Sequence, residues 1–114
     1  MTADHREDVD RAVAWFSARG LVASARGANA LFVGKPAGYL EDGTRVLEPT
    51  LFLEAEDDAW CLRRHRFGGG IDDGPCAAFQ AALELGARLL ALPKSDFAVH
   101  FQPRQLESYR KPKD

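Results

Sequence analysis

The sequence predicts an α+β domain in which helices pack on one face of a mainly antiparallel sheet. Three observations predict this class: an amphipathic helical pattern opens the chain, two β-rich runs flank an acidic turn, and a second helical pattern follows. The expected order is a helix, three or four strands, a helix, a strand and a short terminal helix. With 114 residues, the chain fits one domain, which we place at residues 1–110, with a frayed tail at 111–114.

The first helix is expected over residues 4–19. Its apolar side chains recur at helical spacing, acidic residues occupy its first turn, and Gly20 follows its end. The residues of this apolar stripe are Val9, Ala12, Val13 and Phe16. Two short strands are expected next, at residues 21–25 and 30–33, with turn-forming residues between them.

The stretch 34–49 contains three glycines and two prolines, so we expect a long loop there, with a short strand around 45–47 as an alternative. The clearest strand signal follows it. Residues 50–55 and 60–67 are β-rich and flank a short acidic turn, which predicts a hairpin. Acidic and basic side chains of this hairpin are expected to pair across the two strands, Glu54 and Glu56 with Arg63 or Arg64.

In the C-terminal half, residues 68–75 are expected to be a flexible connector and residues 75–92 a helix. Pro75 suits the first helical position, with Asp73 or Gly74 as the cap. Gly86 costs about 1 kcal/mol in mid-helix relative to alanine, and close packing against the sheet is the expected reason. A last strand is expected at 97–101, with Phe97, Val99 and Phe101 on one face, and a terminal helical turn at 103–109.

The sequence carries no motif for catalysis, cofactor binding or metal binding, so we expect a non-enzymatic protein. The glycine run 68–70 lacks the Lys-Ser/Thr that follows a phosphate loop. Cys61 and His65 lie about 13 Å apart along an expected strand, at roughly 3.3 Å per residue, which is too far to hold one ion. The formal charge of −2 and pI near 5.9 argue against nucleic acid as a partner.

Cysteine usage and the N-terminal residues predict a cytoplasmic protein. Cys61 and Cys76 form no cysteine framework, and two reduced thiols are therefore expected. The polar, acidic N-terminus lacks the basic and apolar regions of a signal peptide. The chain has no apolar run long enough to cross a bilayer, so no membrane association is expected.

The net charge hides an asymmetry that points to a protein partner. Residues 1–58 carry six basic and eleven acidic side chains, whereas residues 59–114 carry nine and six. Aromatic and arginine side chains are the usual anchors of protein interfaces, and acidic clusters suit a basic partner. The candidate contacts are Trp15, Tyr39, Glu41, Asp42, Glu54, Glu56, Asp57, Asp58, Trp60, Arg63, Arg64 and Arg66.

Each candidate also has a purely structural interpretation. Trp15 would then cover the edge of the core and Trp60 would fill it, while Tyr39 would pack the loop against the domain. The basic patch at residues 63–66 would be paired within the sheet rather than free.

The function expected from these features is that of a small protein-binding domain that neutralises or sequesters a partner, such as a basic toxin or a secreted effector. In size, acidity and lack of motifs the chain is similar to bacterial immunity and inhibitor proteins. One alternative is a secretion chaperone, which should be a dimer. Another is a small-molecule-binding or enzymatic domain, with Tyr39, His65 and His100 lining its pocket. The sequence leaves the oligomeric state open.

Overall fold

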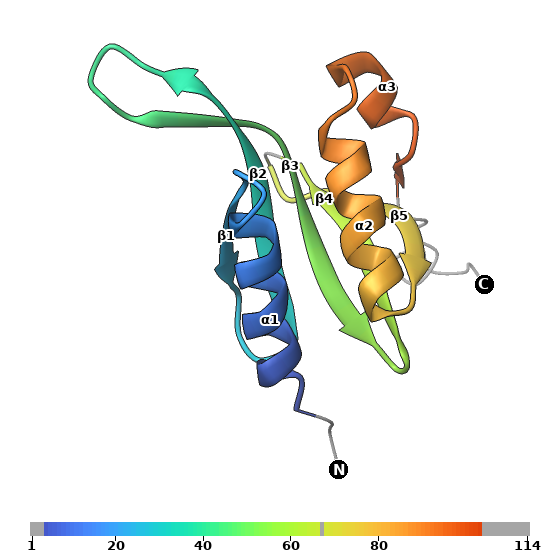
Figure 1. The fold of residues 1–114 in the computed structure, drawn as a ribbon. Coiled ribbons are helices and arrows are strands. Elements are labelled where there is room, and N and C mark those ends of the chain that lie inside the picture. Colours follow the sequence, from blue (N-terminus) through green and yellow to red (C-terminus); the bar gives the residue numbers. More distant parts are fainter. Residues whose placement is uncertain (1–3, 67, 104–114) are drawn as a thin grey trace, which may run out of the picture.

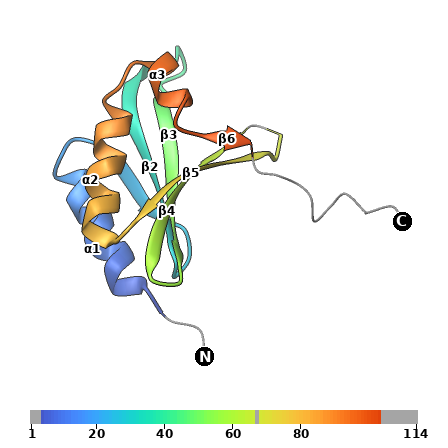
Figure 2. The ribbon, with the colours of Figure 1, turned by 90° about the vertical axis from the view of Figure 1, so that its right-hand side faces the viewer.

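A computed structural model describes residues 4–66 and 68–103. These residues confirm the α+β class: six antiparallel strands form one sheet in the order of the sequence, and helices α1 and α2 cover one face of it (Figure 1). The elements are α1 (Arg6–Ser17), β1 (Val22–Ala25), β2 (Ala30–Tyr39), β3 (Arg45–Glu56), β4 (Ala59–His65), β5 (Ile71–Ala77), α2 (Phe79–Leu90), α3 (Lys94–Ala98) and β6 (Gln102–Pro103). Figure 2 shows α1 and α2 together on one side of the sheet.

The core lies between the two long helices and the sheet. The predicted stripe of α1 is confirmed, since Val9, Ala12 and Phe16 are buried and Val13 packs against the core partly buried. The sheet contributes alternate residues of its central strands, as the twofold side-chain period requires. The largest fully buried apolar side chains are Phe16, Leu31, Leu51, Leu53, Leu62, Leu83 and Leu90, each of which stabilises the fold by about 1.5–3 kcal/mol on burial.

Gly86 is buried, but a Cβ would fit there, so close packing against the sheet does not explain this glycine. A Cβ at this position would lie 3.4 Å from Cζ of Phe16 in α1 and 3.9 Å from Cδ1 of Leu53 in β3. Both distances are ordinary van der Waals contacts. Gly86 therefore sits where α1, α2 and the sheet meet.

The prediction of a long loop over residues 34–49 is wrong, because most of this stretch belongs to strands β2 and β3. The pairing runs out to Tyr39 opposite Arg45, with register shifts on either side of Pro36. Bulges accommodate the glycines and prolines that had indicated a loop. We call residues 35–49 the arm, because they form a two-stranded ribbon that projects beyond the rest of the sheet (Figure 1).

The prediction that a helix begins at Pro75 is also wrong, since residues 71–77 form β5 and α2 begins at Phe79. Ala78 precedes the helix, and no side chain caps it; the proposed caps Asp73 and Gly74 lie within the strand. The β4–β5 register shifts at this point, which is where a strand tolerates glycine and proline. The connector expected at 68–75 is thus mostly strand.

The last strand expected at 97–101 is replaced by α3 and the turn after it. Phe97 and Phe101 are buried with ring centroids 4.9 Å apart, whereas Val99 is 71% exposed. The apolar contact therefore follows the four-residue spacing of a helical turn and not the alternation of a strand. A short strand, β6, follows instead. Of the terminal helix expected at 103–109, only Pro103 belongs to the described residues, and the tail at 111–114 lies outside them.

Candidate protein-binding surfaces

Cys61 and Cys76 form a disulfide between β4 and β5, with a sulfur–sulfur distance of 2.09 Å. The prediction of two reduced thiols is therefore wrong. It had placed Cys76 on a helix, whereas β5 brings it directly opposite Cys61, with the Cα atoms 3.9 Å apart. Disulfides are typical of oxidising compartments, so this one does not support the cytoplasmic location. That location stays a prediction.

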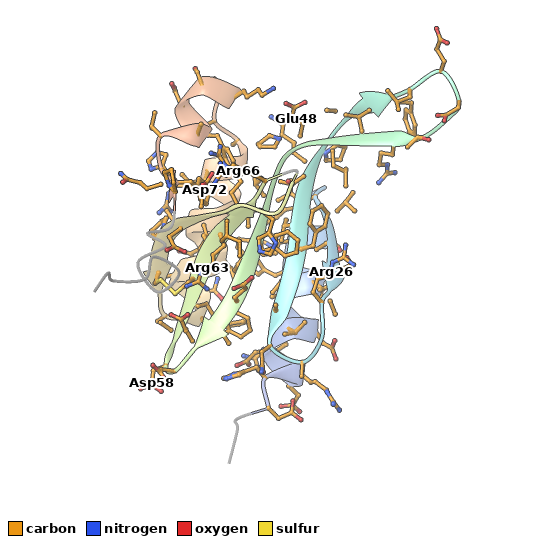
Figure 3. The ribbon with its side chains drawn as sticks, turned by 180° about the vertical axis from the view of Figure 1, so that it is seen from behind. Arg26, Glu48, Asp58, Arg63, Arg66 and Asp72 are labelled. Carbon is orange, nitrogen blue, oxygen red and sulfur yellow. A yellow bond between two sulfur atoms is a disulfide. The ribbon has the colours of Figure 1, made fainter. Side chains whose placement is uncertain are left out.

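Arg63 is the centre of an ion-pair cluster on the sheet face that the helices leave uncovered (Figure 3). Its guanidinium donates from Nη1 to Oε1 of Glu54 at 2.9 Å, from Nη2 to Oε2 of Glu56 at 3.0 Å and from Nε to Oδ1 of Asp73 at 3.0 Å. The predicted pairing of the two glutamates is confirmed for Arg63, and β5 adds a third carboxylate. We call these four residues the Arg63 cluster.

Two opposing effects act on the charge of Arg63, which is only 8% exposed. Burial lowers the pKa of the guanidinium, but its hydrogen bonds to Asp73, Glu54 and Glu56 outweigh burial and raise the pKa above the ordinary arginine value. A pKa raised by folding stabilises the folded chain at every pH below the unfolded value. Arg63 therefore stays charged in the folded chain, and its ion pairs persist as long as the partner carboxylates are ionised.

The other two arginines of the basic patch converge on Asp72, which is 1% exposed. Arg64 donates from Nε and Nη2 to Oδ2 of Asp72, at 3.0 and 2.6 Å, and Nε of Arg66 lies 3.1 Å from Oδ1 (Figure 3). All three arginines of the patch are thus paired within the sheet. The paired carboxylates neutralise the three guanidinium groups, so the patch offers little free positive charge to a partner.

His65 extends a row of rings across the uncovered face. It stacks on Phe52 with centroids 4.0 Å apart, and its Nε2 lies 3.2 Å from Oε2 of Glu54. Phe52 in turn contacts Phe32, at 5.4 Å. His65 also lines a groove of about 500 Å³ beside α3, which neither Tyr39 nor His100 lines. The three residues named for a small-molecule pocket are therefore not brought together there.

The two tryptophans occupy the positions of their structural interpretation. Trp60 is buried, and its ring contacts those of His5 and Phe79 edge-on. Trp15 packs against the edge of the core, with the Arg19 guanidinium 3.6 Å from the centre of its ring. Trp60 is thus too deeply buried to contact a partner, and the Trp15 side chain is only partly exposed.

The end of the arm brings exposed apolar and acidic side chains together. Tyr39 is 68% exposed and Leu40 56% exposed, and Glu41 and Asp42 follow them in the turn. We call residues 39–42 the arm tip. Sequence reasoning named three of these residues and missed Leu40, whose only signal was its place beside Tyr39. The remaining acidic candidates, Asp57 and Asp58, lie in the β3–β4 turn at the other end of the sheet (Figure 3).

Backbone hydrogen bonds hold the arm tip in one conformation. The amide of Leu40 donates to the Thr44 carbonyl at 2.8 Å, and the amide of Gly43 donates to the Leu40 carbonyl at 3.0 Å. The Thr44 amide also donates to Oδ1 of Asp42, at 2.9 Å. The tip therefore presents its side chains from an ordered turn, which lowers the entropic cost of binding.

The pKa of Asp42 reports on this turn. Hydrogen bonds from the Thr44 side chain and then from the Thr44 amide lower the pKa of the carboxyl. A pKa lowered by folding stabilises the turn above the unfolded value, and this stabilisation is lost as the pH falls through the folded value. We expect Thr44→Val to raise the pKa of Asp42, measured by NMR titration of its carboxyl carbon. Thr50→Val, in β3, is the control and should leave that pKa unchanged; an unchanged value in Thr44→Val would contradict the assignment.

The fold and these surfaces define a small α+β domain with one uncovered sheet face and a projecting arm. No protein-family model matches the chain, and no curated protein or solved structure is significantly similar to it. Among the described residues, no helix has the length and apolar character needed to cross a membrane. In the same part of the chain, no three His, Cys, Asp or Glu side chains are grouped so as to hold a metal ion.

Proposed function

We propose that the protein is a non-enzymatic protein-binding domain that neutralises or sequesters a protein partner, with the arm tip as its main contact. The observation that carries this proposal is the exposure of Tyr39 and Leu40 at the end of an ordered projection. Large apolar side chains exposed side by side are typical of interaction sites, and a tyrosine is a frequent anchor of protein interfaces.

The shape and charge of the arm tip indicate the kind of partner. A two-stranded projection fits a concave site, into which Tyr39 and Leu40 would enter, while Glu41 and Asp42 would face its rim. Two carboxylates favour a basic rim and speed the encounter with it. The partner is therefore a protein with a basic cleft, such as a basic toxin or secreted effector whose active site the arm would block.

The arm tip is a better contact than the other acidic candidates because its carboxylates are not used within the fold to neutralise arginines. Glu54 and Glu56 pair with Arg63, so a partner would have to break these ion pairs to use them. Asp57 and Asp58 lack neighbouring exposed apolar anchors among the described residues. Charge and apolar surface coincide at the tip.

The test is site-specific photocrosslinking in the native host. A photoreactive phenylalanine at Tyr39 should capture a basic protein, whereas the same group at the equally exposed Val99 should not. The captured protein is then purified and titrated with the chain. Combined Tyr39→Ala and Leu40→Ala substitutions should weaken binding by about 100-fold, since each anchor is worth about 1–2 kcal/mol.

Val99→Ala is the matched control and should bind as the unmodified chain does. Equal capture from both positions would overturn the proposal. So would undiminished binding by the chain that lacks both apolar anchors.

A further inference from the structure

We propose that, without its partner, the arm tip docks into a groove on the helix face of a second copy of the chain, so that the protein is stored as a dimer. This inference rests on the proposed function, because it assigns a means of regulation to the same tip. The chemistry of two surfaces of this chain indicates that a second copy of the chain fills the groove. One surface is apolar and basic, and the other is apolar and acidic.

The basic surface consists of two grooves that share Arg19, and we call them together the trough. The first groove, of about 570 Å³, lies between the end of α1, the base of the arm and the end of α2; the second, of about 660 Å³, lies between α1 and α2. Apolar side chains form most of their walls. They include Leu21, Leu90 and Ala91 in the first groove and Trp15, Phe79 and Leu83 in the second.

Three cationic side chains, and no acidic one, line the trough: Arg11, Arg19 and Lys35. Arg19 uses one N–H to donate to the carbonyl of Trp15, at 3.0 Å, which leaves the rest of its donors available. Arg11 pairs with Asp8 at 3.0 Å and lies near the Phe79 ring. The strongest unbalanced positive charge is therefore at Arg19 and Lys35, beside the first groove.

The arm tip has the complementary chemistry. Tyr39 and Leu40 match the apolar walls, and Glu41 and Asp42 match Arg19 and Lys35. The tip cannot reach its own trough, because Lys35 and Pro36, which line the trough, are also the base of the same arm. Paired strands continue from Pro36 to Tyr39, which holds the start of the tip roughly 10 Å from the nearest residue of the trough, at about 3.3 Å per residue. A second molecule is needed to fill the trough.

Two copies related by a twofold axis would satisfy both contacts at once, since each arm would reach the other trough. Such a dimer covers both tips. Dimer formation and partner binding then compete for Tyr39 and Leu40. By mass action, the partner shifts the protein from the dimer to a complex that contains one copy of the chain.

The test is sedimentation equilibrium of the full-length, disulfide-bonded chain and two charge-reversed variants. The unmodified chain should show a concentration-dependent dimer. Trough-reversed chain (R19E/K35E) and tip-reversed chain (E41K/D42K) should each dimerise at least about tenfold more weakly, because like charges then meet. An equal mixture of the two variants should recover the dimer, since each tip then faces a trough of opposite charge.

R26E/R88E, which reverses two exposed arginines outside the trough, is the matched control and should dimerise as the unmodified chain does. A monomer at all concentrations, or a mixture that fails to recover the dimer, would overturn the inference. Neither result affects the proposed function, because the crosslinks from Tyr39 are measured separately. Conversely, a recovered dimer without a captured partner would retain the contact between tip and trough and reject the proposed function. R19E/K35E should keep its affinity for the partner, whereas loss of the two apolar anchors should weaken both interactions.

Discussion

Replacing Arg63 with alanine is expected to lower the free energy of unfolding by about 3 kcal/mol, at the lower end of the range for breaking a buried ion pair. The side chain is buried among three carboxylates. Its removal leaves them with like charge and without their shared donor. The lower end applies because Glu56 and Asp73 are partly exposed and water would compensate part of the loss. Urea denaturation of the disulfide-bonded chain measures this change.

Two further variants separate this effect from simple loss of side-chain volume. Arg88→Ala removes an exposed arginine of α2 and should change the unfolding free energy by no more than about 0.5 kcal/mol. Arg63→Lys keeps the charge but loses the planar fork that serves three acceptors, so its stability should be intermediate. If Arg63→Ala were as stable as Arg88→Ala, the Arg63 cluster would contribute nothing to the fold.

Substituting alanine for Gly74 is expected to lower the free energy of unfolding by about 2–3 kcal/mol. The added Cβ would lie 2.9 Å from the Leu62 carbonyl oxygen and 2.6 Å from Cε2 of Phe101. The first of these is a backbone atom of the neighbouring strand and cannot move without shifting β4. Relief of the clash would therefore disturb the sheet next to the disulfide. Thermal and urea denaturation give the measurement.

Gly86→Ala is the matched control, because the same methyl group is added at a glycine that is buried in α2. Its Cβ would meet only ordinary contacts, and alanine gains up to about 1 kcal/mol over glycine inside a helix. This variant should therefore be as stable as the parent chain or more so. Equal destabilisation of both variants would show that the close approach at Gly74 is not the cause.

The elements predicted correctly are those whose patterns have a single interpretation. In α1, Val9, Ala12 and Phe16 share one helical face. In the β3–β4 hairpin, a β-rich run that contains Leu51 and Leu53 leads into a short acidic turn. In both elements, these apolar residues are buried in the core. The ion pairs from Glu54 and Glu56 to Arg63 could be predicted for the same reason, because cross-strand neighbours follow from the position of the turn.

The missed elements depend on contacts distant in sequence. Strand β5 contains Gly74 and Pro75, which favour a turn, and the burial of Asp72 requires arginines from the neighbouring strand. The disulfide was missed with it, since Cys76 lies opposite Cys61 only if β5 is a strand. The outer arm lies beyond the helices that cover the sheet, so its strands show no alternating pattern. Sequence reasoning could name Tyr39, Glu41 and Asp42 but could not place them on a projection.

The bulges that mislead prediction of the arm also determine how it can be recognised. Past Gly34 on one side and before Phe52 on the other, no described strand pairs with the outer edges of β2 and β3. Unpaired edges usually invite another strand to add by backbone hydrogen bonds. Here Pro36 and Pro49 each lack a backbone N–H, and bulges flank Pro36. Both features disfavour the addition of another strand, so we expect the side chains of the tip to dominate recognition by the arm.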